Sequence, residues 1–258
     1  MEPRPDADGA ILKVSGLRMS YGKFAALVSV DLSVRRRTIH SVIGPNGAGK
    51  TTLFHCITGT RVPSGGKVEF EGVDVTRLPS HRRTAIGMAR SFQITSIFQA
   101  LTVRENLRLA AQARRAWAAM NFWRTVGALD EPREQAEALL RRLGLEQRAD
   151  VPAGELSHGQ QRILEVGLAM AARPRMLFLD EPTSGMGVDD IPTITELIRE
   201  LGRDHTILLI EHNMSVVMSI SDRVTVMHQG KVLVEGDPEQ VREDARVRTA
   251  YLGEVVDA

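Results

Sequence analysis

GPNGAGKT, at residues 44–51, fills every constrained position of the pattern G-x-x-x-x-G-K-[ST]. In this pattern, glycines allow backbone N–H groups to converge on phosphate oxygens, and the following helix adds partial positive charge at its N-terminus. The segment 38–43 predicts a compact strand that runs into the loop, and the helix-forming run at 52–57 predicts a helix after it. This order of elements predicts a phosphate-binding loop in an α/β protein.

The residues of this loop have distinct expected roles toward a nucleoside triphosphate. Lys50 supplies a flexible cation for the β- and γ-phosphates, and the Thr51 hydroxyl can bind Mg²⁺. A glycine-rich turn that binds nothing is the alternative, and the complete motif between a strand and a helix disfavours it. The residues expected to contact the nucleotide here are Gly44, Pro45, Asn46, Gly47, Ala48, Gly49, Lys50, Thr51 and Thr52.

Two consecutive acids, Asp180 and Glu181, follow the apolar run 176–179. A buried parallel strand brings its C-terminal residues to the edge of the sheet where a phosphate loop also lies. We therefore expect Asp180 to bind Mg²⁺, directly or through water, and Glu181 to orient or deprotonate an attacking water. A pair of solvated acids before Pro182 is the weaker alternative. Two acids beside a magnesium–nucleotide complex predict hydrolysis.

Apolar patterning predicts the rest of the architecture. Alternation between residues 11 and 34, interrupted by Tyr21-Gly22, predicts antiparallel β structure. Strands, helices and a hairpin are further predicted at 66–72, 176–179, 191–201, 206–210 and 224–234. Apolar strands alternating with helices imply a mainly parallel sheet that is covered on both faces. Residues 85–172 are predicted to be largely helical, as a lobe inserted between the two halves of the sheet.

Composition excludes several classes of protein. The 258 residues carry 33 Lys and Arg against 32 Asp and Glu, and only 4% are aromatic, which argues against nucleic-acid binding by bulk charge or base stacking. Hydrophobic residues at 43% exclude wholesale disorder. No apolar run approaches the ~18 residues of a spanning helix. We expect a soluble, cytoplasmic, globular protein with a short disordered lead-in at residues 1–9.

A few further residues have structural expectations. The single cysteine, Cys56, can form neither an internal disulfide nor a cysteine-based zinc site, and we expect it to be a small buried hydrophobic residue. The arginine pairs Arg82-Arg83 and Arg141-Arg142 are expected to lie on solvated faces. None of these features indicates a binding site.

The string LSHGQQR, at residues 156–162, lies between the phosphate loop and the strand-end acids. It resembles the signature motif of the ATP-binding cassette (ABC) family, the ATPase subunits of ABC transporters. A short Ser-x-Gly-Gln string is weak alone, but its place in this order of motifs makes it specific. The resemblance implies that Ser157, His158, Gly159 and Gln160 contact nucleotide.

Other positions resemble the same family. Tyr21 resembles the aromatic residue that stacks on adenine, and Gln93 resembles the glutamine that touches Mg²⁺ and begins a loop facing the membrane subunits. His212 resembles the switch histidine that contacts the γ-phosphate, and residues 184–187 resemble the loop that meets a partner cassette. There are two departures, because His158 stands where the commonest signature has glycine and the loop 184–187 lacks its usual terminal acid. We nevertheless expect activity.

The resemblance covers nearly the whole chain and implies an architecture. It implies a P-loop NTPase of the ABC cassette type, with a mainly parallel, RecA-like core, an antiparallel β subdomain and a helical lobe at about 85–172. Residues 10–258 would form this single ABC ATPase domain. Catalytic roles would fall to Glu181 and His212, and ATP and Mg²⁺ would be the cofactors, with Thr51, Gln93 and Asp180 as metal ligands.

The resemblance also implies partners. A second ABC ATPase subunit, identical or a sister cassette, would complete each ATP site with its signature motif. Separate transmembrane permease subunits would carry the solute, and an extracytoplasmic substrate-binding protein would act indirectly. The chain would then lie peripherally on the cytoplasmic face of the inner membrane, and no nucleic-acid partner is expected.

Finer details resemble one branch of the family, the ATPases of branched-chain amino-acid importers. The resemblance rests on ARSFQ at 89–93, on a long helical lobe with an extra stretch at 112–132, and on the ending AYLGE at 250–254. Urea and short-chain amide importers share these features. Lipopolysaccharide-export cassettes share the ending but usually carry Leu-Pro-Gln where this chain has Ser-Phe-Gln. The single cassette disfavours a soluble, non-transport ABC ATPase. The signature motif disfavours a P-loop kinase.

Overall fold

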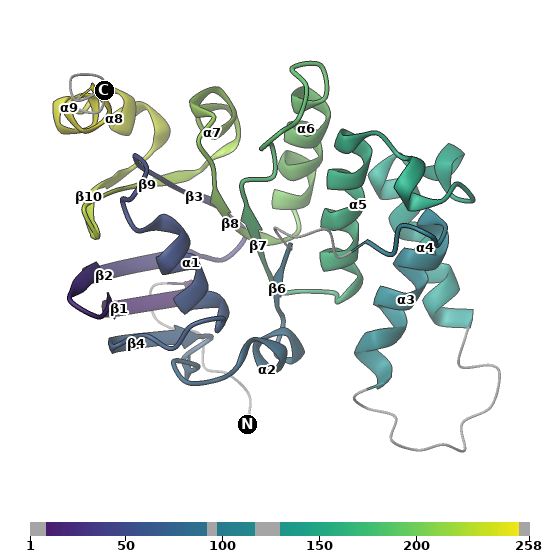
Figure 1. Cartoon of the computed structure of the whole chain (residues 1–258), viewed down its shortest axis with the longest axis horizontal. Helices are drawn as coiled ribbons and strands as arrows, with labels where there is room; N and C mark the ends of the chain where they lie inside the picture. The colour runs from purple at the N-terminus through teal and green to yellow at the C-terminus, as the bar shows by residue number, and fades with distance from the viewer. Residues whose placement is uncertain (1–8, 92–96, 117–129, 253–258) are drawn as a thin grey trace.

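The computed structural model describes residues 9–91, 97–116 and 130–252. Almost all of the expected lead-in at 1–9 lies outside these residues, and so does Gln93. Figure 1 shows an antiparallel sheet at one end, a helical lobe at the other and a core sheet between them.

The antiparallel sheet is built from the N-terminal hairpin. Strand β1 (Ala10–Tyr21) pairs antiparallel with β2 (Phe24–Arg35), and Tyr21 is opposite Phe24 at the turn. Strands β4 (Gly65–Phe70) and β5 (Val73–Asp74) complete the order β2-β1-β4-β5. The prediction of antiparallel β structure in this region is confirmed.

The core sheet has the strand order β10-β9-β3-β8-β7-β6. Its parallel strands are β3 (Ile39–Ile43), β6 (Met88–Arg90), β7 (Met176–Asp180), β8 (Thr206–Ile210) and β9 (Arg223–His228). Strand β10 (Lys231–Gly236) is antiparallel to β9. The mainly parallel sheet is therefore confirmed, and β6 adds a core strand within the range expected to be largely helical.

Strand β7 shows how the two faces of the core sheet are covered. Its side chains alternate between the faces. Leu177 and Leu179 pack in a cluster with α5 (His158–Ala171) and α6 (Ile191–Gly202). Met176 and Phe178 pack in a second cluster with α1 (Lys50–Thr58) and the antiparallel sheet. Helices α1 and α5 therefore cover opposite faces of β7.

The remaining helices lie around this frame. The lobe consists of α3 (Val103–Ala116), α4 (Asp130–Leu143) and α5, and short 3₁₀ turns at Glu146–Arg148 and Ala153–Glu155 lie between α4 and α5. The other helices are α2 (Ser80–Ala85), α7 (Met214–Ile220), α8 (Pro238–Glu243) and α9 (Ala245–Leu252). In the part of the chain that the structure describes, no helix is long and apolar enough to cross a membrane.

The expectation that both arginines of the pair at 82–83 are solvated is wrong for Arg83. Its exposed fraction is 1%, because the side chain passes under the C-terminus of α1. The guanidinium donates hydrogen bonds to backbone carbonyl oxygens of Cys56, Ile57, Thr76 and Leu78. Helix C-termini leave carbonyl groups without intrahelical partners, and Arg83 supplies the donors for two of them. Burial lowers the pKa of Arg83 to about 10.

The expectation for Cys56 is confirmed. The thiol is fully buried in the cluster between α1 and the sheets. Burial raises its pKa to about 11, so it packs as a neutral, small hydrophobic group.

Candidate active site

The phosphate loop connects the buried strand β3 to helix α1, and two of its glycines are required by close backbone contacts. Gly44 has φ 147°, and a Cβ atom there would lie 2.1 Å from the carbonyl oxygen of Met227. Gly49 has φ 100°, and its Cβ would lie 2.7 Å from the carbonyl oxygen of Ala26. A side chain at either position would displace the backbone. The loop therefore needs glycine for its shape as well as for access to phosphate.

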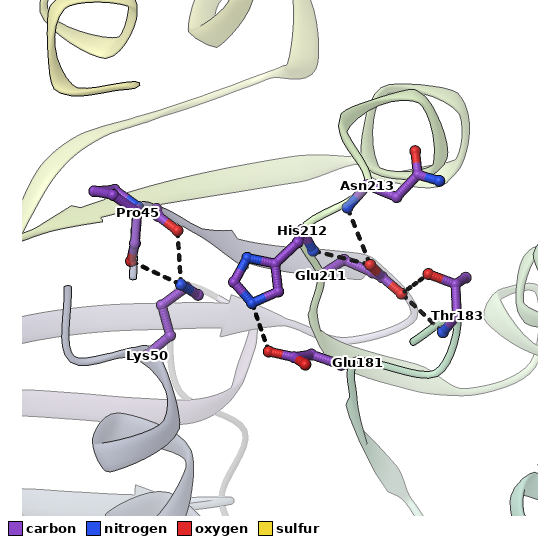
Figure 2. A network of polar contacts seen from close by, with 8 residues as sticks. Pro45, Lys50, Glu181, Thr183, Glu211, His212 and Asn213 are labelled. Carbon is purple, nitrogen blue, oxygen red and sulfur yellow. Dashed lines mark hydrogen bonds and ion pairs between the residues drawn. The ribbon is translucent and has the colours of Figure 1, made fainter. Parts of the chain in front are cut away.

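Lys50 is the first residue of α1, and its side chain folds back over the loop. The ammonium Nζ donates to the carbonyl oxygens of Gly44, at 2.6 Å, and Pro45, at 2.9 Å. Figure 2 shows these two contacts beside the end of the core sheet. The loop is also fixed from outside, because the Ala48 carbonyl accepts from the Gly230 N–H at 3.0 Å. The cation is thus held beside the backbone that would bind phosphate.

Asp180 is the last residue of β7, and its carboxylate is fully buried. Its Oδ2 lies 3.4 Å from Nη2 of Arg90, while Oδ1 has no hydrogen-bond partner. Burial raises the pKa of Asp180 to about 6, and the charge of Arg90 opposes that shift. A buried oxygen without a donor is costly to maintain unless a ligand supplies the missing interaction.

Glu181 and His212 come from the ends of neighbouring parallel strands, β7 and β8. Nε2 of His212 lies 2.5 Å from Oε1 of Glu181 (Figure 2). Glu181 has φ 49°, in the left-handed region that is uncommon for residues other than glycine, and its N–H donates to the carbonyl of Ile210 at 2.8 Å. Strained backbone of this kind persists only where surrounding contacts hold it.

The signature residues begin helix α5. Ser157 is the N-cap: its hydroxyl accepts from the Gln160 N–H at 3.2 Å, and the Gln160 side chain accepts from the Ser157 N–H at 3.2 Å. This reciprocal pair is a capping box. Gly159 packs closely against Asp190, because a Cβ at position 159 would lie 2.7 Å from Cγ of Asp190. The exposed His158 side chain extends to within 3.2 Å of a Cβ position on Gly185.

The structure gathers some of the expected site residues and separates others. The phosphate loop, Lys50, Glu181 and His212 lie together at the carboxyl edge of the core sheet. Tyr21 lies at the end of β1, partly exposed, at the hairpin turn. The signature lies at the start of α5. Helices α5 and α1 cover opposite faces of β7. Gln93 lies outside the described residues.

Two charged residues of this site are absent from the sequence expectations. Arg90, at the end of β6, lies between the buried carboxylate of Asp180 and the face of Phe54, with its guanidinium carbon 4.9 Å from the ring centroid. Glu211 follows β8 directly, is 2% exposed and accepts hydrogen bonds from two loops. Arg90 ends β6 and Glu211 directly follows β8, at the sheet edge where Asp180 ends β7, and that common position is the signal that could have found them.

A glycine-rich loop at a helix N-terminus, with acids at the ends of strands in the same parallel sheet, defines a P-loop protein that binds nucleoside triphosphates. Residues 27–184 match the family described as ABC transporter, and residues 231–257 match the family described as branched-chain amino acid ATP-binding cassette transporter. The chain belongs to the ABC transporter family. It is an ATP-binding cassette ATPase, and the predicted family and fold are confirmed.

Similar proteins cover the chain almost completely. The high-affinity branched-chain amino acid transport ATP-binding protein BraF of Pseudomonas aeruginosa is 42% identical over 95% of this chain and 98% of its own. The corresponding LivG protein of Escherichia coli is 41% identical with the same coverage. The lipopolysaccharide export system ATP-binding protein LptB of Haemophilus influenzae is 32% identical over 95% of this chain and 98% of its own.

Solved structures agree with this assignment. The ADP conformation of MJ1267, an ATP-binding cassette of an ABC transporter, superposes with a TM-score of 0.83 at 30% identity, over 95% of this chain and 99% of that one. A nucleotide-free ATP-binding cassette from an ABC transporter gives a TM-score of 0.81 at 30% identity, over 94% and 98%. The parallel core, the antiparallel sheet and the helical lobe are thus the arrangement of an ABC cassette.

Proposed function

We propose that this chain is the ATP-hydrolysing subunit of an importer for branched-chain amino acids. The observation that carries the choice of solute is the match of residues 231–257 to a branched-chain amino acid transporter family. Within the described residues, this segment forms β10, α8 and α9. The relatives named for branched-chain amino acid transport support the same choice.

In this proposal the chain's own residues divide the work of hydrolysis. The loop from Gly44 to Thr52 binds the phosphates through its N–H groups, and Lys50 turns its ammonium to the β- and γ-phosphates. Glu181 accepts a proton from the attacking water, and His212, 2.5 Å from it, orients the Glu181 carboxylate and contacts the γ-phosphate. Tyr21 stacks on the adenine. The proposal is supported by the position of Lys50, Glu181 and His212 at one edge of the sheet.

The residues at this edge fit Mg²⁺. Magnesium prefers hard oxygen ligands and keeps several waters, with one or two protein ligands plus phosphates. Asp180 offers a buried Oδ1 that has no hydrogen-bond partner, and Thr51 offers a hydroxyl on the first turn of α1. Gln93 completes the proposed ligands. When bound, the ion would neutralise charge that develops on the transferring phosphate.

A second cassette completes each ATP site in this proposal. Helices α1 and α5 cover opposite faces of β7, so the signature cannot cover the phosphate loop of its own chain. Ser157, His158, Gly159 and Gln160 would instead meet the nucleotide of a partner, which is either a second copy or a sister cassette. ATP stabilises this closed dimer only as far as it binds the closed state more tightly than the open one. Hydrolysis then favours opening.

The proposal places the chain peripherally on the cytoplasmic face of the membrane. Separate permease subunits form the path for the solute, and the helical lobe with the loop after Gln93 transmits the opening and closing. A substrate-binding protein on the other side delivers the amino acid and reaches this chain only through the permease.

The test is to purify the membrane complex through a tag on this chain and to identify its substrate-binding protein. Titration calorimetry of that protein with leucine, isoleucine, valine and urea measures which solute it captures. Binding of a branched-chain amino acid, together with its ATP-dependent uptake by vesicles containing the complex, is expected. Exclusive capture of urea, or co-purification with lipopolysaccharide-export subunits, would overturn the proposed solute while leaving the ATPase assignment intact.

A further inference from the structure

Glu211 occupies the junction between the two loops that carry Glu181 and His212. It follows strand β8 directly, and its carboxylate is buried, with an exposed fraction of 2%. Oε1 accepts from the N–H of Thr183 at 3.0 Å and from its hydroxyl at 2.5 Å. Oε2 accepts from the N–H groups of His212 at 2.9 Å and Asn213 at 3.1 Å. Every oxygen of the carboxylate therefore has two donors (Figure 2).

These contacts join segments that are far apart in the chain. Thr183 lies two residues after Glu181, whereas His212 and Asn213 lie on the loop after the neighbouring strand. Together with the contact between His212 and Glu181, they form a closed ring from Glu181 through Thr183, Glu211 and His212. Charge-assisted hydrogen bonds to a buried carboxylate are short and strong. The ring therefore fixes the distance between the two loops.

The ring of contacts also holds the backbone of Glu181 in place. Glu181 has φ 49°, a strained backbone conformation that persists only where neighbouring contacts hold it. The chain is held before it by the bond from its N–H to the Ile210 carbonyl, and after it by the bonds from Thr183 to Glu211. Without the second anchor, the strained residue could relax and move its carboxylate away from His212.

We propose that Glu211 is a positioning residue for ATP hydrolysis, which acts by holding the Glu181 and His212 loops in register. It reaches neither nucleotide nor water in this role, and it acts only through the two side chains that it aligns. This inference rests on the proposed roles of Glu181 and His212. It adds a residue outside the phosphate loop, the strand-end acids and the signature.

The central variant is Glu211→Gln, assayed in the full chain. An amide keeps the size of the side chain but has one oxygen, so its NH₂ group must face one of the two pairs of donors. We expect kcat to fall by about 10-fold or more while the KM for ATP stays within about 2-fold, because the phosphate loop is unchanged. The matched control is Glu235→Gln. The Glu235 carboxylate is partly buried, but it pairs with Arg223 and Thr225 away from the site, so we expect this variant to keep the wild-type kcat.

A spectroscopic readout separates positioning from a general structural role. The ring signals of His212 in a ¹H–¹³C spectrum, assigned by their loss in His212→Ala, should shift in Glu181→Gln because the ring loses its carboxylate partner. Glu211→Gln should shift them in the same direction, and Glu235→Gln should leave them in place. An unmoved His212 signal, or a wild-type kcat in Glu211→Gln, would overturn the proposal.

If Glu211→Gln does not fold, a second pair of variants carries the test. Thr183→Val removes one donor to Glu211 at constant shape, whereas Thr183→Ser keeps the hydroxyl. We expect kcat to fall several-fold in the valine variant and to be restored in the serine variant; equal activity of the two would overturn the proposal. Failure of the underlying function is distinguishable, because then Glu181→Gln and His212→Ala would themselves turn over ATP at the wild-type rate.

Discussion

Arg90 lies with Nη2 3.4 Å from Oδ2 of Asp180, and its guanidinium rests on the ring of Phe54. The guanidinium lies beside a carboxylate that is wholly buried, yet the pKa of Asp180 is still raised to about 6. Desolvation is the largest cause of the shift and exceeds the attraction of Arg90. The strand-end acid is therefore kept at the site at a cost in stability, which is expected of functional residues.

The first prediction concerns the stability cost of Asp180. The native pKa of about 6 lies above the ordinary value of 3.8, so between these values the native state binds more protons than the unfolded state. The free energy of unfolding therefore falls as pH rises through this window. Asp180→Asn should raise the free energy of unfolding at pH 7 by about 1–3 kcal/mol in the absence of nucleotide, while abolishing hydrolysis. Urea denaturation measures the difference.

The pH dependence supplies the control for that prediction. Because the shift acts only on the ionised carboxylate, the advantage of Asp180→Asn should disappear as pH falls toward about 4. An advantage of equal size at low and neutral pH would assign the effect to packing of the amide and contradict the electrostatic origin.

The second prediction concerns Glu181. Glu181→Gln keeps the shape of the side chain but cannot accept the proton of water, so ATP should still bind while turnover falls by about 100-fold or more. Fluorescent nucleotide titration measures binding, and phosphate release measures turnover. Glu239→Gln, an exposed acid at the start of α8, is the control and should match the wild type. Unaltered turnover in Glu181→Gln would refute the assignment of the base.

The third prediction separates two roles of Ser157, the N-cap of α5 and the proposed contact with a partner's nucleotide. Aspartate is as good an N-cap as serine, but its charge repels a γ-phosphate. Ser157→Asp should therefore keep the melting temperature and ATP binding by the monomer, yet lose ATP-driven dimerisation in the Glu181→Gln background. Ser157→Arg should also prevent the dimer, and light scattering reports it.

Alanine at the same position provides the contrast. Ser157→Ala removes the capping oxygen and should cost about 1 kcal/mol of stability, with a smaller effect on dimerisation than aspartate. Normal ATP-driven dimerisation of Ser157→Asp would show that the signature does not act on a partner's nucleotide.

Much of this architecture can be predicted because it depends on local pattern. The loop at 44–51, the apolar run before Asp180 and the alternation around Tyr21 each indicate their element from neighbouring residues, and the structure has all three elements. The contacts of Glu211 with Thr183, by contrast, join residues 28 positions apart. A charged side chain gives no local sign that donors from another loop will surround it.

Arg83, on helix α2, is a second residue whose contacts cannot be predicted from its sequence neighbours. Arg82 and Arg83 are adjacent and identical in type, yet Arg82 is exposed and Arg83 is 1% exposed. What distinguishes them is the direction of each side chain on the short helix α2 and the nearby end of α1, which are tertiary features. Composition therefore predicts a solvated pair, and the fold buries one member.

The last prediction follows from this difference between neighbours. Arg83→Lys keeps the charge but replaces a planar fork, which reaches the carbonyls of Cys56, Leu78 and Thr76, with a single ammonium that cannot satisfy all of them. Leaving buried acceptors without donors should lower the free energy of unfolding by about 2–4 kcal/mol. Arg82→Lys is the matched control and should change it by less than about 0.5 kcal/mol. Chemical denaturation of both variants measures the difference, and equal stability would show that the guanidinium does not hold the C-terminus of α1 in place.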